Sequence, residues 1–125
     1  MTQEELYNLK NLLLRDLCAR LPYGVKVQYM NNIFVIDYVS SYEEVKLDIP
    51  DNWTVGVSEV KPYLFPLSSM TEKQKKEYQY ITERWMYDPS YSISDSTDWL
   101  NKNHFDYRGL IEKGLAIDAT GLNIY

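Results

Sequence analysis

Apolar residues near the start of the chain recur at helical spacing. Thr2 followed by Glu5 is typical of a capping box, and Pro22 and Gly24 mark the end of the pattern. The apolar stripe is broad, which favours a helix that covers a sheet over the alternative, a helix that binds a partner. The stripe consists of Leu6, Leu9, Leu12, Leu13, Leu14, Leu17, Cys18 and Leu21.

The following stretch changes to a two-residue period, which is typical of strands. Two alternating runs flank Asn31 and Asn32, a dipeptide that tolerates positive φ, so they predict a β-hairpin. The apolar start of the second run indicates a central strand. The predicted elements are strands at 25–29, 33–39 and 45–49, a turn at 50–52, and a weaker strand at 53–57 that Gly56 interrupts.

The second half of the chain predicts helices and irregular segments. Pro62 and Pro66 indicate an extended crossing segment at 61–67 with unpaired amides. The elements predicted after it are a helix from a capping box at 69–72 to about Trp85, an irregular loop at 87–94, a helix from Asp95 or Ser96 through Asn103, and a strand at 115–117.

This order predicts an α+β fold: an N-terminal helix, an antiparallel sheet of three to four strands, then C-terminal helices. A length of 125 residues fits a single domain over residues 1–125.

The charge balance disfavours nucleic acid as a partner. The chain has 18 Asp and Glu against 13 Lys and Arg, a net charge of −5, whereas phosphate binding needs a basic surface. No apolar run approaches the roughly 20 residues of a membrane span, and the start of the chain is acidic and polar, unlike a secretory leader. We therefore expect a cytoplasmic protein without membrane contact.

One cysteine and one histidine restrict the chemistry. Cys18 has no second cysteine to pair with, and His104 alone cannot form a two-histidine zinc motif. Cys18 lies within the leucine pattern, so we expect a buried thiol and not a catalytic one. Neither a metal nor another cofactor is expected.

Three segments carry a resemblance. They are LCARLPYGVKVQ at 17–28, KPYLFPLSSMTEKQKKE at 61–77 and DWLNKNHFDYRGLIEKGLAID at 98–118, the last being the most specific. Together they resemble a family of short uncharacterised proteins of gut Bacteroidetes that prophages and other mobile elements often encode. The resemblance implies a small cytoplasmic protein of phage-like origin, and it assigns no activity and no site residue.

One cluster of residues could carry chemistry. His104 near Asp106 could act as a general base, and Arg108 could hold a phosphate or a carboxylate. The simpler interpretation is structural: His104 ends a helix, Asp106 caps the next turn, and Arg108 pairs with an acid. Binding of a ligand or partner and catalysis are the two alternatives, and no residue is assigned a catalytic role.

Aromatic residues are the strongest compositional feature. The chain has 12 Tyr, 3 Trp and 3 Phe, or 14% aromatic residues, and tyrosine is common at protein interfaces. Shielding of the rim of a small core is the competing explanation. The predicted contact patch consists of Trp85, Tyr87, Tyr91, Trp99, His104, Asp106 and Arg108.

These observations favour a non-enzymatic protein-interaction or accessory module of a phage or mobile element, with a homodimer as one possible assembly. The alternative is a small hydrolase that uses His104 with Asp106 and Arg108. A weaker third hypothesis is binding of single-stranded nucleic acid by stacked aromatic rings, which the net charge of −5 disfavours.

Overall fold

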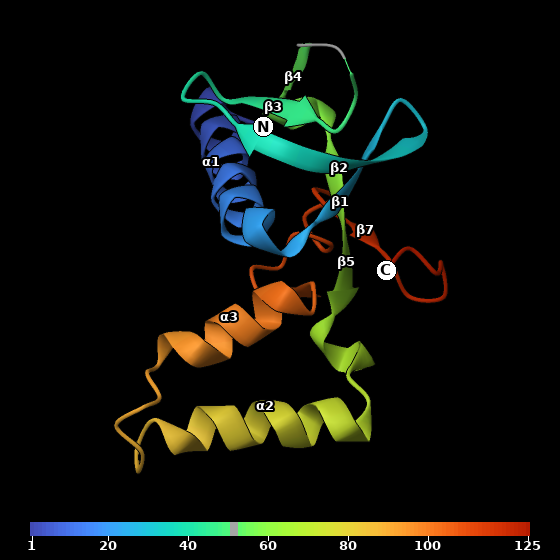
Figure 1. Cartoon of the computed structure of the whole chain (residues 1–125). Coiled ribbons are helices and arrows are strands. Elements are labelled where there is room, and N and C mark those ends of the chain that lie inside the picture. Colours follow the sequence, from blue (N-terminus) through green and yellow to red (C-terminus); the bar gives the residue numbers. More distant parts are fainter. Residues whose placement is uncertain (51–52) are drawn as a thin grey trace.

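The computed structural model describes residues 1–50 and 53–125, and Figure 1 shows their arrangement. The predicted turn at 50–52 lies partly outside the described residues. The helices are α1 (Gln3–Arg20), α2 (Glu72–Arg84) and α3 (Ser94–Lys102), with single 3₁₀ turns at Leu21–Tyr23, Val57–Glu59 and Leu67–Ser69. The strands are β1 (Lys26–Tyr29), β2 (Asn32–Val39), β3 (Glu44–Leu47), β4 (Thr54–Gly56), β5 (Lys61–Pro66), β6 (Phe105–Asp106) and β7 (Ile117–Asp118).

The predicted first helix is confirmed, but only its second half is buried. The Thr2 hydroxyl accepts a hydrogen bond from the Glu5 amide at 3.1 Å and caps the helix. Leu13 and Leu17 enter the core, whereas Leu6 is 55% exposed. The part of the stripe that packs against the core is therefore shorter than the sequence predicted, although Leu12, Leu14 and Leu21 also pack there.

The prediction of a buried thiol at Cys18 is wrong, because this side chain is exposed. It immediately follows the fully buried Leu17 on α1, and neighbouring positions of a helix point about 100° apart. Because leucines occupy so many positions around Cys18, the sequence pattern did not show whether this residue lies on the buried or the exposed face of α1.

The predicted hairpin is also confirmed. Tyr29 pairs with Asn32 across the turn, and Met30 and Asn31 adopt φ values of 47° and 67°. Two consecutive positive φ values are typical of the tight turn whose twist matches that of the flanking strands. The turn therefore lies one residue earlier than the predicted Asn31-Asn32.

The sheet is larger than predicted and it is mixed. Its seven strands follow the order β4-β3-β2-β1-β5-β6, and β7 pairs with β5 outside this path. The pairs β4–β3, β3–β2, β2–β1 and β1–β5 are antiparallel. By contrast, β6 and β7 run parallel to β5. The expected antiparallel sheet of three to four strands is corrected accordingly.

The predicted crossing segment at 61–67 is the strand β5. Its two prolines are tolerated because each partner pairs with only two of its residues, so no partner needs a continuous row of amide donors. Lys61 and Pro62 pair with β1, the next two residues with β7, and Phe65 and Pro66 with β6.

The core lies between α1 and the sheet, and the last part of the chain completes it. Leu110 and Ala116, from the segment between β6 and β7, are buried in the same cluster as Leu17 and Leu64. We call α1, the strands and residues 104–125 the body.

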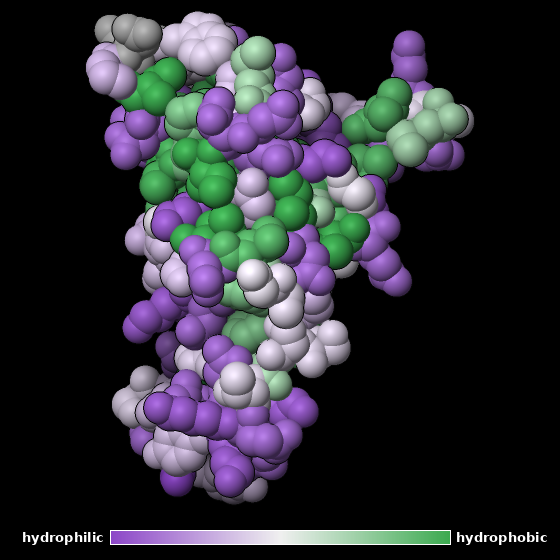
Figure 2. All heavy atoms as spheres, turned by 90° about the vertical axis from the view of Figure 1, so that its right-hand side faces the viewer, coloured by the Kyte–Doolittle hydropathy of each residue, from purple (hydrophilic) through white to green (hydrophobic). Residues whose placement is uncertain are grey.

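Helices α2 and α3 form a separate layer beside the body, which we call the lobe (residues 72–102). Figure 1 shows the lobe below the sheet, and Figure 2 shows apolar side chains gathered on the body while the lobe presents mainly hydrophilic ones. Thr71 and Gln74 form the capping box at the start of α2. Its end at Arg84 confirms the predicted helix.

Candidate functional site

The structure divides the predicted contact patch between two environments. Trp85 and Tyr87 are exposed at the end of the lobe, with 45% and 77% of their surface accessible. Tyr91 and Trp99 are half-buried in the lobe. His104, Asp106 and Arg108 belong to the body.

A row of three aromatic rings connects the lobe to the body. Trp99 lies nearly parallel to Phe105 of β6, with ring centroids 5.7 Å apart, and Tyr78 of α2 packs on Trp99 at 5.5 Å. Tyr80 and Tyr91 make an edge-to-face contact at 6.5 Å. Aromatic packing of this kind is what holds α2 in place.

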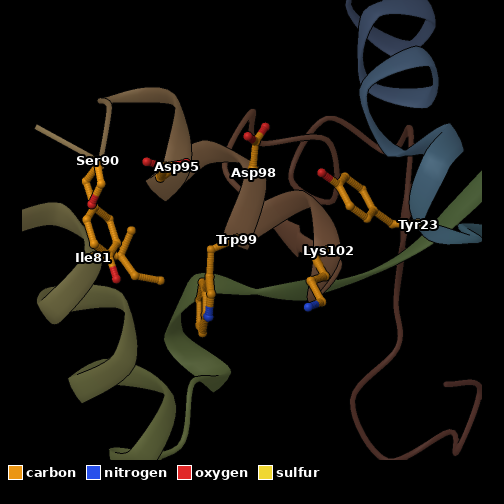
Figure 3. Close-up of a pocket in the computed structure, with 8 residues that line it drawn as sticks. Tyr23, Ile81, Ser90, Asp95, Asp98, Trp99 and Lys102 are labelled. Carbon is orange, nitrogen blue, oxygen red and sulfur yellow. The ribbon is translucent and has the colours of Figure 1, made fainter. Parts of the chain in front are cut away.

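Two open grooves flank the line where α2 meets α3, and they share Ile81, Tyr91 and Trp99. The Ile81 side chain reaches from α2 toward the Trp99 ring in the first groove, which has a volume of about 340 Å³ (Figure 3). The second groove, of about 510 Å³, is bordered by Lys76 and Glu77. Both have an apolar floor that can receive a side chain of a partner.

Charged residues border the first groove. Asp95 and Asp98 lie along one edge, and Lys102 lies on the far side of Trp99 (Figure 3). The Asp95 carboxylate accepts a hydrogen bond from the Ser92 amide at 2.6 Å, so its position is fixed, whereas Asp98 is exposed. The edge nearest the apolar floor therefore carries two carboxylates that can attract a cation.

His104 lies in a tight turn between α3 and β6, with a positive φ of 61°. Its imidazole is stacked on the ring of Tyr125, with centroids 3.7 Å apart and planes inclined by 12°. Burial, together with the positive charges of Arg20 and Lys26, lowers the pKa of His104 to about 4. The ring is therefore neutral and weakly basic at neutral pH, which does not suit a general base.

Asp106 has the structural role that the sequence suggested. Its two carboxylate oxygens accept hydrogen bonds from the amides of Leu110 and Ile111, both at 2.9 Å. This buried carboxylate therefore caps the turn that begins the last core segment, and both of its oxygens are occupied.

Arg108 pairs with an acid that is distant in the sequence. Its guanidinium contacts the Asp16 carboxylate of α1 at 2.8 Å and lies 4.5 Å from the centroid of the Tyr107 ring. Among the described residues, no hydrogen bond or ion pair connects any two of His104, Asp106 and Arg108.

A buried ion pair on α1 was missed in the sequence. Asp16 and Arg20 are fully buried, their side chains are 2.8 Å apart, and Arg20 also donates to the Phe105 carbonyl at 2.6 Å. With Arg108, this network joins α1 to the segment after α3. The sequence did contain an indication of this pair. Asp16 and Arg20 are four residues apart and adjoin Leu13 and Leu17, so all four lie on the same buried face of α1.

Tyr125 was also missed. Its hydroxyl accepts a hydrogen bond from the Lys26 amide and donates one to the Tyr63 carbonyl, both at 2.8 Å, so it bridges β1 and β5. Burial raises the pKa of this phenol to about 12. The Lys26 ammonium donates to the Ile124 carbonyl at 2.7 Å. No local pattern indicates a contact between residues 26 and 125.

Within the described ranges, no three His, Cys, Asp or Glu side chains lie close enough together to hold a metal ion. None of the helices in these ranges has both the length and the apolar character of a membrane span.

No protein-family model matches the chain, and neither a curated protein nor a solved structure is significantly similar to it.

Proposed function

We propose that the chain is a non-enzymatic protein-interaction module and that the lobe is its contact surface. The observation that carries the proposal is the exposure of α2. The structure describes all 13 residues of this helix, and none of them is buried. The helix and the turn after it nevertheless expose Tyr80, Trp85, Met86 and Tyr87. Large aromatic side chains that contribute so little to the core are typical of interface anchors.

The grooves indicate the chemistry of the partner. An apolar floor of Ile81, Tyr91 and Trp99 fits one apolar side chain, and Asp95 and Asp98 at its edge favour a neighbouring lysine or arginine. The proposed occupant is a segment of another protein that presents an apolar residue next to a cation.

The hydrolase alternative has less support. His104 is weakly basic, Asp106 caps a turn with both oxygens, and Arg108 is paired with Asp16. A catalytic triad needs its members within hydrogen-bond reach of one another and of a substrate.

The resemblance to proteins of prophages and mobile elements supports an accessory role in such an element. A cytoplasmic location belongs to the same proposal.

The test is a selection from a random peptide library on the immobilised full chain, followed by fluorescence anisotropy with a synthetic consensus peptide. We expect the selected peptides to share an apolar residue adjacent to Lys or Arg. Asp98→Lys should weaken binding about tenfold, because it replaces an attraction by a repulsion. The matched control is Asp37→Lys on β2, an exposed charge reversal in the body that should leave the affinity unchanged.

Two results would contradict the proposal. One is the absence of any peptide enriched above background. The other is equal affinity of the consensus peptide for the wild type and for Asp98→Lys combined with Tyr91→Ala.

A further inference from the structure

The N-terminal half of α1 has little contact with the body. Residues 1–8 are all exposed, although they include Met1 at 81%, Leu6 at 55% and Tyr7 at 61% exposure. The second half of the same helix is anchored by Leu13 and Leu17. Of these exposed residues, Met1, Glu5 and Asn8 lie on one side of the helix, whereas Leu6 and Tyr7 point in other directions.

One side of α1 carries two adjoining grooves of about 480 and 500 Å³, which share Asn8 and Leu12. The groove at the N-terminal end is bordered by Met1, Glu5 and Leu9, and the other extends to Arg15. Met1, Glu5, Asn8, Leu12, Arg15 and Ala19 follow one another at alternating spacings of four and three. This spacing places the six residues along one side of α1, which we call the seam, and its apolar members are Met1, Leu12 and Ala19.

The charged positions of the seam are complementary in the antiparallel direction. If two copies of α1 cross at Lys10, Glu5 of one copy faces Arg15 of the other, and Asn8 faces Leu12. A rise of about 1.5 Å per residue places both members of each pair at equal distances from the crossing point. Lys10 lies away from this seam, because its ammonium contacts Glu43 at 2.6 Å.

The charges favour this direction over a parallel one. Glu4 and Glu5 make the first turn of α1 acidic, and the exposed charge near its other end is Arg15. Within the described part of the chain, neither Glu5 nor Arg15 forms an ion pair. A parallel pairing would place Glu5 against Glu5, whereas the antiparallel pairing forms two Glu5–Arg15 contacts. Lys113, which borders the N-terminal groove, is exposed and can turn its ammonium to solvent.

We propose that α1 is the interface of a symmetric homodimer, in which the seam from Met1 to Ala19 packs antiparallel on the same seam of a second copy. Each N-terminal half then covers the second half of the partner's helix. A single helix pair is a small interface, so the dimer is weak and forms at high micromolar concentration.

The test is sedimentation equilibrium of the full chain at concentrations up to about 1 mM, a range that covers weak interfaces. We expect the wild type to approach twice its monomer mass of 14.8 kDa. Glu5→Arg and Arg15→Glu should each weaken the dimer about tenfold or more, because like charges then face each other twice. The double variant restores both ion pairs and should recover the wild-type dissociation constant to within about threefold.

Glu4→Arg is the matched control, because it makes the same charge reversal in the first turn of α1 but lies off the seam. It should leave the dissociation constant near that of the wild type. Far-UV circular dichroism of every variant checks that the helix is intact.

A wild type that stays monomeric at about 1 mM would overturn the proposal, since even weak dimers associate there. Single reversals that leave association unchanged, or a double variant that does not recover it, would also overturn it, because association would then use another surface.

Discussion

The body and the lobe use aromatic and charged residues in opposite ways. In the body, Asp16 and Arg20 are fully buried and hold α1 to the segment after α3. In the lobe, the ion pair of Lys75 and Glu72 is exposed, and Tyr80 of α2 is half exposed to solvent. The comparison teaches that the same residue types stabilise one region by burial and remain exposed in the other.

The two regions meet at Trp99. Its ring packs on Phe105 of the body on one side and on Tyr78 of α2 on the other. Leu100 and Asn101, next to Trp99, are buried, so α3 belongs partly to the body and α2 depends on it. We therefore expect α2 to be the least stable helix of the chain.

The largest effect is expected from breaking the buried ion pair. Asp16→Ala leaves the guanidinium of Arg20 buried without its counter-ion and should lower the free energy of unfolding by about 3–5 kcal/mol. Lys75→Ala in the lobe removes only an exposed pair and should change it by less than about 0.5 kcal/mol. Urea denaturation of both variants measures their free energies of unfolding. Similar losses of free energy in the two variants would contradict the expected difference between the body and the lobe.

The second effect is a loss of stability in acid that originates in the body. The folded pKa of His104, about 4, lies below its ordinary value of 6.5. Between these values the unfolded chain binds a proton that the folded chain does not, so stability is complete above about pH 6.5 and falls as the pH approaches 4. The slope contributed by His104 should stay below about 1.4 kcal/mol per pH unit, because the two states differ by at most one proton on this ring.

Urea denaturation across this pH range measures the slope. His104→Asn is the informative control, because asparagine tolerates the positive φ at this position and does not titrate. Its curve should be flatter between pH 6.5 and 4 than that of the wild type. Identical slopes in the two proteins would show that other groups cause the acid sensitivity.

A smaller effect is expected from the hydroxyl that joins β1 and β5. Tyr125→Phe removes the partner of the Lys26 amide and the Tyr63 carbonyl, and should cost about 1–2 kcal/mol of unfolding free energy. Tyr87→Phe, in the exposed turn after α2, should cost almost nothing. Equal values for the two variants would contradict the bridging role of Tyr125.

The smallest change in stability concerns the surface of the lobe. Tyr80→Ala should lower the free energy of unfolding by about 0.5–1 kcal/mol, because half of the residue is already exposed and the ring loses one edge-to-face contact, with Tyr91. The same variant should weaken binding of the consensus peptide. A large loss of stability without a change in affinity would mean that Tyr80 supports the fold and not the contact.

Local signals made the first half of the fold predictable. Thr2 and the leucine spacing determined α1, and Gly24 ends the 3₁₀ turn that follows it. The alternation around Met30 and Asn31 determined the hairpin. These elements depend on residues within a few positions of one another. The start of α2 at Thr71 is explained by the same kind of signal.

The rest of the sheet depends on contacts that no local pattern records. β6 and β7 have two residues each and exist because β5 supplies their hydrogen bonds, so neither has a recognisable period. Pro62 and Pro66 argued against a strand, and the divided pairing of β5 removes that objection.

The candidate site shows the same limit. Nearness of His104, Asp106 and Arg108 in the sequence suggested a shared role, but their partners are Tyr125, the amides of residues 110 and 111, and Asp16. The exposure of Tyr87 was easier to predict, because the turn-rich sequence around it indicates a surface loop.

The most direct test of the contrast between body and lobe is native-state hydrogen exchange, followed by NMR on the wild-type chain. We expect the amides of α2 to exchange through local opening at least about a hundredfold faster than those of Leu17 and Leu64, which should open only with the whole protein. Equal protection of α2 and the body would contradict the account, because α2 would then be an integral part of the core and not a helix held for contact.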